Sequence, residues 1–324
     1  MNILITGAAG FVGSHLVDLF LKHNHHVWGV DNLLTGDERN LQAAKHDSKF
    51  TFIQADVNQD PAQYFPADFL THSQSLDLIL HFASPASPPL YQKYPVETYL
   101  VNSFGTHQLL NWVKNNQPSA KLLFASTSEV YGNPTVHPQP ESYWGNVNPN
   151  GIRACYDESK RLGETICGVH ARDFGLDVRI VRIFNTYGPR MNLYDGRVIP
   201  NFIRQALANE PLTIYGDGTQ TRSYCYVDDL VRGIYDFSTL PGLNNQTINL
   251  GNDRELNTFQ TAELIWSIVH PGEPLKFVLQ PLPQDDPTVR RPDLSKANNW
   301  LNYSPLVSAE AGWLKTVTYF RELL

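Results

Sequence analysis

The sequence has little cysteine, little charge and no long apolar run. Its three cysteines, Cys155, Cys167 and Cys225, form no C-x-x-C pair and cannot all be bonded to one another, so we expect buried, reduced thiols. Charged residues make up 18% of the 324 residues and the formal net charge is −7, which argues against a nucleic-acid-binding protein with a basic surface. The 42% of hydrophobic residues is ordinary for a packed globular enzyme.

Membrane and metal signals are also missing. No apolar run is long enough to span a bilayer, and MNILITGAAG reaches glycine without the basic start of a signal peptide. We therefore expect a cytoplasmic protein with no membrane or nucleic-acid partner. The histidine-rich residues 23–26 match no zinc spacing, so we interpret them as a solvated turn and predict no metal site.

Buried strands and amphipathic helices alternate from the first residue onward. Helical spacing marks SHLVDLFLKH, and apolar strands are expected at NILIT, HVWGV, FTFIQAD, LDLILHFA, KLLFAS and VRIVRIF. This order predicts an α/β fold, with a Rossmann-like doubly wound parallel sheet over residues 1–185. Loops rich in Pro, Gly and Asp follow, so residues 186–324 are expected to form a smaller substrate lobe, with residues of about 225–252 returning to the first lobe.

A glycine-rich loop, GAAGFVG, follows the first predicted strand and opens the first predicted helix. Gly7 permits a tight turn, Gly10 lets the backbone approach a pyrophosphate, and Gly13 allows the helix to pack closely on the strand. The glycine pattern alone is a weak signal, but here it is flanked by a strand and a helix, and Asp31 ends the second strand. Together these features favour a dinucleotide site.

Asp31 indicates which dinucleotide is bound. A carboxylate at this position accepts hydrogen bonds from the ribose hydroxyls and repels a 2′-phosphate, so NAD is predicted over NADP. The alternative is that Asp31 is only a turn residue before Asn32. Asp56 and Val57, which follow the third strand, are expected beside the adenine.

Tyr156 and Lys160 lie four residues apart in YDESK, so they share a face of a helix. An ammonium near the phenol, aided by the positive nicotinamide of a bound cofactor, lowers the pKa of a tyrosine and makes it a proton acceptor. Such a pair alone is more often a surface pair. The glycine-rich loop and the hydroxyl-rich strand end at Thr127 favour the catalytic interpretation, while Glu129 is either part of this chemistry or ion-paired at the strand end.

Several stretches resemble a known family. GAAGFVGSHL, STSEVYG, YDESK and RIFNTYGPR are similar to the extended short-chain dehydrogenase/reductase family that modifies nucleotide sugars, and the similarity covers nearly the whole chain. Within this family, HFASPASPP, PQPESYWGNVNPNGIRACYDESKR and DDPTVRRPD resemble the UDP-glucuronate decarboxylases. The resemblance implies a homodimeric lyase that uses NAD to oxidise C4 of UDP-glucuronate, loses carbon dioxide from the 4-keto sugar and returns the hydride, giving UDP-xylose.

The resemblance also implies roles for the site residues. Thr127 and Tyr156 would polarise the sugar C4 oxygen, Lys160 would hold the nicotinamide ribose, Glu129 would handle the C5 proton or orient a water, and Ser128 would hydrogen-bond the sugar or enolate. Cofactor contacts are expected, besides Tyr156 and Lys160, from Gly7, Gly10, Phe11, Val12, Gly13, Asp31, Asn32, Thr35, Gly36, Asp56, Val57, Phe82, Ala83, Ser84, Ala125 and Thr186.

The nucleotide sugar needs cationic and amide donors for its pyrophosphate. Arg222 and Arg290 are the candidates, because a guanidinium offers several fixed donors; the alternative is that both are surface arginines. The resemblance implies Arg222 on the pyrophosphate and Arg290 on the diphosphate or the sugar end. Further substrate contacts are expected from Asn185, Val198, Asn201 and Tyr215. The resemblance also implies a dimer formed by helices that cover about residues 101–114 and 156–173.

Other activities on the same scaffold stay open. The 4-epimerases usually lack the carboxylate of Glu129, and dTDP-glucose 4,6-dehydratases carry an acid at the position of Ser128, although GDP-mannose 4,6-dehydratases also resemble TSE here. A regulator that binds NAD without turnover is a further alternative. Leu100 stands where the decarboxylases normally have a lysine, which admits another nucleotide hexose, and residues 56–81 are longer than usual, so no family contact is transferred to them.

Overall fold

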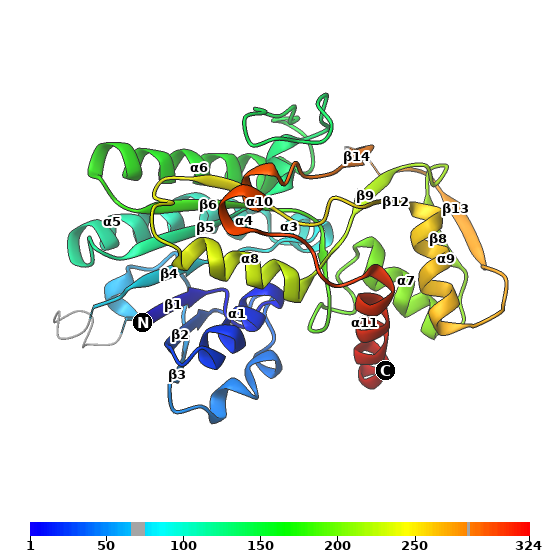
Figure 1. Cartoon of the computed structure of the whole chain (residues 1–324), viewed down its shortest axis with the longest axis horizontal. Helices are drawn as coiled ribbons and strands as arrows, with labels where there is room; N and C mark the ends of the chain where they lie inside the picture. Colours follow the sequence, from blue (N-terminus) through cyan, green and yellow to red (C-terminus); the bar gives the residue numbers. More distant parts are fainter. Residues whose placement is uncertain (66–74, 284–285) are drawn as a thin grey trace.

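The structure is a computed structural model that describes residues 1–65, 75–283 and 286–324. Part of the long 56–81 region therefore lies outside the described residues. Seven parallel strands form one sheet in the order β11-β6-β5-β4-β1-β2-β3 (Figure 1). Their bounds are Asn2–Thr6 (β1), His26–Asp31 (β2), Phe50–Gln54 (β3), Leu78–His81 (β4), Lys121–Thr127 (β5), Val178–Ile183 (β6) and Thr247–Leu250 (β11). The prediction of a Rossmann-like doubly wound sheet is confirmed.

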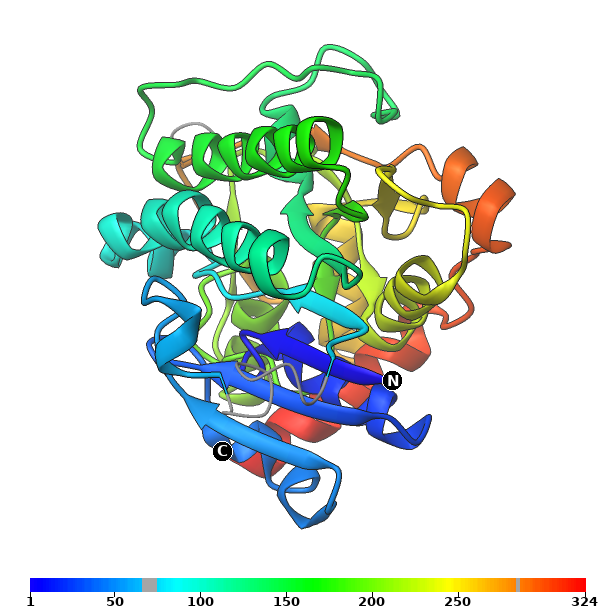
Figure 2. The same cartoon turned by 90° about the vertical axis from the view of Figure 1, so that its left-hand side faces the viewer.

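Helices cover both faces of this sheet (Figure 2). On one face α1 (Phe11–Lys22) packs against α8 (Val227–Thr239). On the other face α6 (Ala154–Phe174) packs against α4 (Pro95–Leu100) and α5 (Thr106–Asn116). The strands are near-continuous apolar runs because both of their faces are covered.

The chain leaves the sheet after β6 and returns to it at β11, which pairs with β6. Between and after these strands it builds a smaller lobe from short elements (Figure 1). These elements are β7 (Thr186–Tyr187), α7 (Val198–Leu207), β8 (Leu212–Tyr215), β9 (Thr221–Ser223), β10 (Cys225–Tyr226), β12 (Glu255–Asn257), α9 (Thr258–Val269), β13 (Phe277–Gln280) and β14 (Val289–Arg290).

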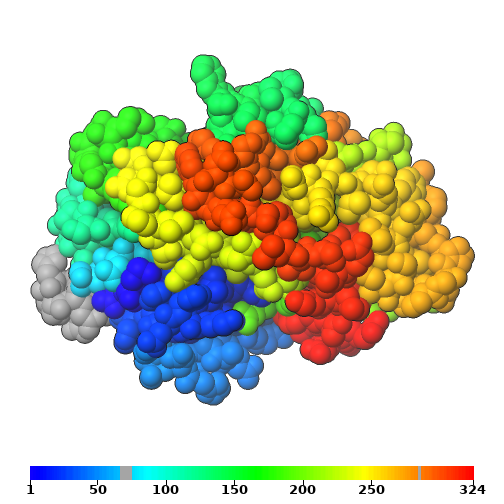
Figure 3. All heavy atoms as spheres, in the orientation of Figure 1, coloured from blue at the N-terminus to red at the C-terminus, as the bar shows by residue number. Residues whose placement is uncertain are grey.

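The C-terminal segment ties the two lobes together. Helix α10 (Ser295–Leu301) packs on β11 and α8, whereas α11 (Ala309–Leu323) packs on α7 and α9 of the smaller lobe. Figure 3 shows these orange and red segments lying across one face of the molecule. The C-terminal segment therefore contacts both lobes and holds the smaller lobe against the sheet.

The cysteines are free thiols, and a histidine of the 23–26 turn packs on a neighbouring aromatic ring. Cys167 and Cys225 are buried, Cys155 is half-buried, and all three are free thiols. His23, in the turn after α1, stacks on Tyr235 with ring centroids 4.5 Å apart. Within the described ranges no group of three or more His, Cys, Asp or Glu side chains is placed to hold a metal ion, and no helix there is long and apolar enough to cross a membrane.

Candidate active site

A cavity of about 900 Å³ lies at the carboxyl edge of the sheet and is lined by residues of both lobes. A second cavity, of about 70 Å³, shares Gly7, Gly10 and Phe82 with it. The parallel strands place the ends of β1, β2, β4 and β5 at this edge, which is where doubly wound sheets bind their ligands. The two cavities together form the candidate active site.

The glycine-rich loop forms a cradle that only glycine fits. Gly7 has φ +71°, and its N–H donates to the Val30 carbonyl over 2.8 Å. A Cβ on Gly13 would lie 2.0 Å from the carbonyl oxygen of Gly7, so the start of α1 packs directly on the loop. The free N–H groups of the first helical turn face the shared cavity and suit a pyrophosphate.

Asp31 ends β2 beside this cradle. Its two carboxylate oxygens accept from the N–H groups of Leu33, at 2.8 Å, and Ala9, at 2.9 Å. Burial raises the pKa of Asp31, and these two hydrogen bonds oppose the rise. A Cβ on Gly36 would lie 2.9 Å from both carboxylate oxygens, so the lack of a side chain at Gly36 lets its backbone pass close to Asp31. The carboxylate and the cradle fit the ribose and pyrophosphate of NAD.

The expected cofactor contacts line these two cavities. The smaller cavity is lined by the residues expected near the adenosine half, namely Asp31, Asn32, Thr35, Gly36, Asp56, Val57, Phe82, Ala83 and Ser84, together with Gly7 and Gly10. The larger cavity is lined by the others, Phe11, Val12, Gly13, Ala125, Tyr156, Lys160 and Thr186. The structure therefore brings the whole expected set to one continuous surface.

The end of β5 and the first turns of α6 bring the tyrosine, lysine and hydroxyl groups together. Thr127 caps the short turn that follows β5, its hydroxyl accepting from the Glu129 N–H over 3.2 Å. Lys160 donates to the Ala125 carbonyl over 2.7 Å and lies 5.9 Å from the centre of the Tyr156 ring. Tyr156 stacks on Tyr91 with ring centroids 5.0 Å apart and planes 4° from parallel. The phenol is thus held rigidly at the cavity wall.

The pKa values of this group differ from the expectation based on the sequence. Burial raises the pKa of Tyr156, while a hydrogen bond with the Thr127 side chain opposes the rise, and Lys160 is not among the leading causes. Burial instead lowers the pKa of Lys160 to about 7. The lysine is only partly charged near neutral pH, so the residues of the chain alone keep Tyr156 as a neutral phenol.

Glu129 lies in a cluster of arginines. Arg153 Nη2 donates to Glu129 Oε2 over 2.7 Å, and Arg290 Nη2 donates to the same oxygen over 3.2 Å. Burial would raise the pKa of Glu129, but the charges of Arg290 and Arg153 outweigh burial and lower the pKa to about 2. Glu129 is therefore a carboxylate across the working pH range and cannot itself be a proton donor. The ion pairing weighed for Glu129 is therefore present, and its part in the chemistry stays a prediction.

The expected substrate residues occupy the far end of the larger cavity, with one exception. Arg222 lines the cavity and pairs with Asp286 over 3.0 Å, and the remaining lining residues of the expected set are Thr127, Ser128, Glu129, Asn185, Val198, Asn201 and Tyr215. Arg290 is the exception: it is 1% exposed and donates to the Ser128 carbonyl and to Glu129. The structure places it behind Glu129 instead of on the cavity surface, where its bonds to the Ser128 carbonyl and to Glu129 hold the guanidinium.

Some functional side chains of the cavity were not in the predicted set. Arg153, Tyr91 and Arg197 all line the larger cavity, and Arg197 pairs with Asp195. Arg153 immediately precedes α6, three residues before Tyr156, and this proximity was the signal that could have found it. Leu100, which replaces the family lysine, is not among the described residues that line either cavity.

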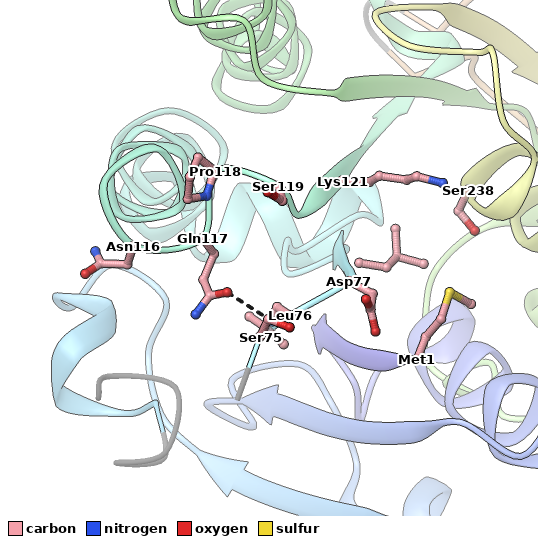
Figure 4. A pocket seen from close by; sticks show the side chains of 11 residues that line it. Met1, Ser75, Leu76, Asp77, Asn116, Gln117, Pro118, Ser119, Lys121 and Ser238 are labelled. Carbon is pink, nitrogen blue, oxygen red and sulfur yellow. Dashed lines mark hydrogen bonds between the residues drawn. The ribbon is translucent and has the colours of Figure 1, made fainter. Parts of the chain in front are cut away.

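A separate cavity of about 320 Å³ lies at the opposite, amino edge of the sheet (Figure 4). Its walls include Asp77, Gln117 and Lys121, and Gln117 accepts from the Leu76 N–H over 3.1 Å. None of the residues expected to act on a ligand lines it. The chemistry therefore belongs to the carboxyl edge.

Curated relatives resemble this chain over its full length. UDP-glucuronic acid decarboxylase 1 of Xenopus tropicalis is 47% identical over 323 residues, covering 100% of this chain and 73% of the relative. UDP-glucuronic acid decarboxylase 3 of Arabidopsis thaliana is 45% identical over 313 residues, covering 96% of this chain and 86% of the relative.

A solved structure resembles the fold equally completely. The UDP-glucuronic acid 4-epimerase of Bacillus cereus, in complex with UDP-glucuronic acid and NAD, matches with a TM-score of 0.87 and 30% identity, over 100% of both chains. Residues 3–251 match the model of the NAD dependent epimerase/dehydratase family. With the parallel sheet, the glycine cradle and the Tyr156–Lys160 pair already in place, this match leads to one conclusion: the chain belongs to the NAD dependent epimerase/dehydratase family.

Proposed function

We propose that this protein is an NAD-dependent UDP-glucuronate decarboxylase that forms UDP-xylose through a 4-keto sugar. The observation that carries the proposal is the 45–47% identity to UDP-glucuronic acid decarboxylases over almost the whole chain. The site supports it, because Thr127, Glu129, Tyr156 and Lys160 line one cavity with a dinucleotide cradle at its other end. The substrate class follows from these relatives and from the arginines of the smaller lobe.

The cofactor end holds and orients NAD. The cradle at Gly7 to Gly13 suits its pyrophosphate, Asp31 its adenosine ribose and Lys160 its nicotinamide ribose. When bound, NAD supplies a hydride acceptor at sugar C4, a hydride donor for the final reduction, and a positive charge. Tyr156 hydrogen-bonds with Thr127, and burial raises the pKa of its phenol. The positive charge of the bound cofactor would favour loss of the phenol proton, and the resulting phenolate could then take the proton of the C4 hydroxyl.

The substrate end manages the carbon chemistry. A ketone at C4 is β to the C6 carboxylate, so the C5–C6 bond breaks, carbon dioxide leaves, and the electron pair passes into an enolate. C5 must then gain a proton. Because the pKa of Glu129 is lowered to about 2, this side chain acts as a hydrogen-bond acceptor that orients a water or the sugar, with Ser128 beside it.

A UDP-glucuronate 4-epimerase is the second candidate. It is favoured by the likeness to the Bacillus cereus enzyme, at 30% identity and with both chains fully covered. An epimerase keeps the C6 carboxylate and returns the hydride to the other face of C4. The product distinguishes the two, because only a decarboxylase forms a pentose.

The test is to incubate the purified protein with UDP-glucuronate in deuterated water, without added reductant, and follow the sugar protons by NMR. UDP-xylose with deuterium at C5 is the expected product, and Tyr156→Phe is expected to reduce its rate by about 10³-fold. Tyr91→Phe, which keeps the stacked ring, is the control and should retain most of the activity. UDP-galacturonate as product would favour the epimerase, and no turnover would overturn the proposal.

We also propose a homodimer formed by α5, α6 and the turn before α5. Phe104, Leu162 and Phe174 on these elements are 47–49% exposed, which is unusual for large apolar side chains of one region. Light scattering that gives the mass of two chains would support the dimer, and the mass of one chain would contradict it. The cytoplasmic location stays a prediction.

A further inference from the structure

Arg153 is one of the charged residues of the substrate end that the sequence patterns left unassigned. It caps the N-terminus of α6, and its backbone carbonyl accepts from the N–H groups of Tyr156 and Asp157. Its side chain is 11% exposed and lines the large cavity. The residue therefore joins the helix of the Tyr156–Lys160 pair to the opposite wall.

The guanidinium of Arg153 forms an ion pair with one carboxylate oxygen of Glu129. Nη2 donates to Glu129 Oε2 over 2.7 Å, and Arg290 also binds Oε2. None of the described residues makes a hydrogen bond with the other oxygen, Glu129 Oε1. The Glu129 side chain lines the cavity. The two oxygens are thus divided between the protein, which takes Oε2, and the cavity, which is left Oε1.

The two arginines contribute in different ways. Arg290 is buried behind Glu129 and is also bound to the Ser128 carbonyl, so it belongs to the rigid support. Arg153 reaches Glu129 from the α6 side, and its Nη1 donates to Asp286 over 3.3 Å. Of these two arginines, Arg153 is therefore the one that connects Glu129 to the helix of the proton acceptor and to the loop that carries Asp286.

We propose that Arg153 is a positioning residue for Glu129, which it holds as a carboxylate with Oε1 presented to the group that is hydrogen-bonded during protonation of C5. This inference rests on the proposed function. An ionised carboxylate next to the sugar ring is otherwise disfavoured by burial, because the charge loses its hydration. Two guanidiniums on Oε2 offset that cost and leave Oε1 to accept a hydrogen bond.

Charge supports this geometry. The charges of Arg290 and Arg153 are what lower the pKa of Glu129 against its burial. Removal of Arg153 leaves burial opposed by fewer cations, so the pKa of Glu129 must rise. The other charged and titratable groups facing Glu129 are Arg222 on β9, Asp157 and Tyr156 on α6, Tyr91 on α3 (Pro88–Lys93) and Asp286 before β14.

The first test compares Arg153→Met, which keeps the length of the side chain but not its charge, with Arg153→Lys. Arg153→Met is expected to lower kcat by about 10- to 100-fold, the usual cost of a lost charged hydrogen bond, with KM changed by less than about 3-fold. The acid limb of its pH–kcat profile should move to higher pH, because Glu129 is then protonated at higher pH. Arg153→Lys should restore part of kcat and return the acid limb toward that of the wild type.

The second test separates positioning from general damage. In a Glu129→Gln background, Arg153→Met should cause little further loss, because the group on which it acts is gone. An unshifted acid limb together with the same fold-loss in both backgrounds would overturn the proposal. Circular dichroism and NAD content report whether each variant is folded.

A third readout needs no turnover, so it separates this inference from the proposed function. Infrared difference spectra between low and neutral pH, compared with Glu129→Gln, identify the protonated-carboxyl band of Glu129. That band should be absent at pH 4 in the wild type and present in Arg153→Met. If UDP-glucuronate is not converted but the band behaves in this way, the substrate assignment fails and the role of Arg153 stands. If UDP-glucuronate is converted but the band is the same in both proteins, Arg153 does not control Glu129.

Discussion

The two ends of the active-site cavity are built on different principles. The cofactor wall, formed by Gly7, Gly10, Gly13, Asp31 and Phe82, consists of backbone and one carboxylate bound to backbone N–H groups. The substrate wall, formed by Glu129, Arg153, Arg222 and Asp286 with Arg290 buried behind Glu129, consists of side-chain ion pairs. The first wall is built from closely packed backbone, whereas the second is built from paired charges.

This difference matters because a nucleotide sugar brings its own negative charges. Arg222 is the expected ligand of the diphosphate, yet in the free protein it is paired with Asp286, which also binds Arg153. A diphosphate that binds Arg222 must therefore compete with an internal carboxylate. On the cofactor wall, by contrast, no side chain of the described residues caps the start of α1, and its first turn carries no acidic residue.

The largest effect is expected from a substitution in the glycine-rich loop of the cofactor wall. A Cβ at Gly7 would lie 2.7 Å from backbone atoms of Phe82 and Ala83, and φ there is +71°. Gly7→Ala is expected to abolish NAD binding and to lower the free energy of unfolding by about 3 kcal/mol, through strain and overpacking. Denaturant unfolding and the NAD content of the purified protein measure the two effects.

Gly175→Ala is the matched control. Gly175 also has φ +71°, but a Cβ there would meet nothing within 4 Å. It should cost only the backbone strain, about 1 kcal/mol, and leave NAD binding intact. Equal losses in both variants would mean that φ alone, and not the close approach of the backbone, defines the cofactor wall.

The next largest effect is expected from removing a cation of the substrate wall. Arg222→Ala should weaken UDP binding by about 10- to 100-fold, because charged hydrogen bonds to the diphosphate are lost, and should raise KM for the sugar nucleotide. NAD affinity should be unchanged, since Arg222 lies on the smaller lobe. Calorimetric titration with UDP and with NAD measures both quantities, and an unchanged UDP affinity would remove Arg222 from the substrate site.

The smallest expected effect is an increase in the affinity for UDP. Asp286→Asn removes the internal competitor of the diphosphate, so UDP should bind about 3- to 10-fold more tightly, while uridine, which has no phosphate, should bind as before. Asp217→Asn, an exposed carboxylate of the same lobe that binds Thr219, is the control. Weaker UDP binding by Asp286→Asn would indicate that Asp286 holds Arg222 in its binding position and does not compete.

Much of the cofactor wall could be predicted because its determinants are local. Gly7, Gly10 and Gly13 lie within one loop, and Asp31 follows at the end of the next strand, so spacing alone places them at one edge of a parallel sheet. The pairing of Tyr156 with Lys160 follows equally from one turn of α6. The protonation states did not follow, because burial decides them: it raises the pKa of Tyr156 and lowers that of Lys160.

The substrate wall shows the limit of such patterns. The VRRPD pattern predicts Arg290 as a substrate ligand, but Arg290 is buried and bound to Glu129 and the Ser128 carbonyl. Arg153 reads as an ordinary helix-start residue, but it reaches both Glu129 and Asp286, which is 133 residues further along the chain. Both facts depend on how the smaller lobe packs on the sheet.

The sequence by itself determined the parallel sheet, the dinucleotide loop, the preference for NAD and the tyrosine–lysine pair, because each depends on residues close together in the chain or on the period of a strand or helix. Only the tertiary structure decided which arginines face the cavity, which carboxylate each one neutralises and which groups are ionised. Those properties arise from burial and from charges brought together across more than a hundred residues, and no local pattern encodes them.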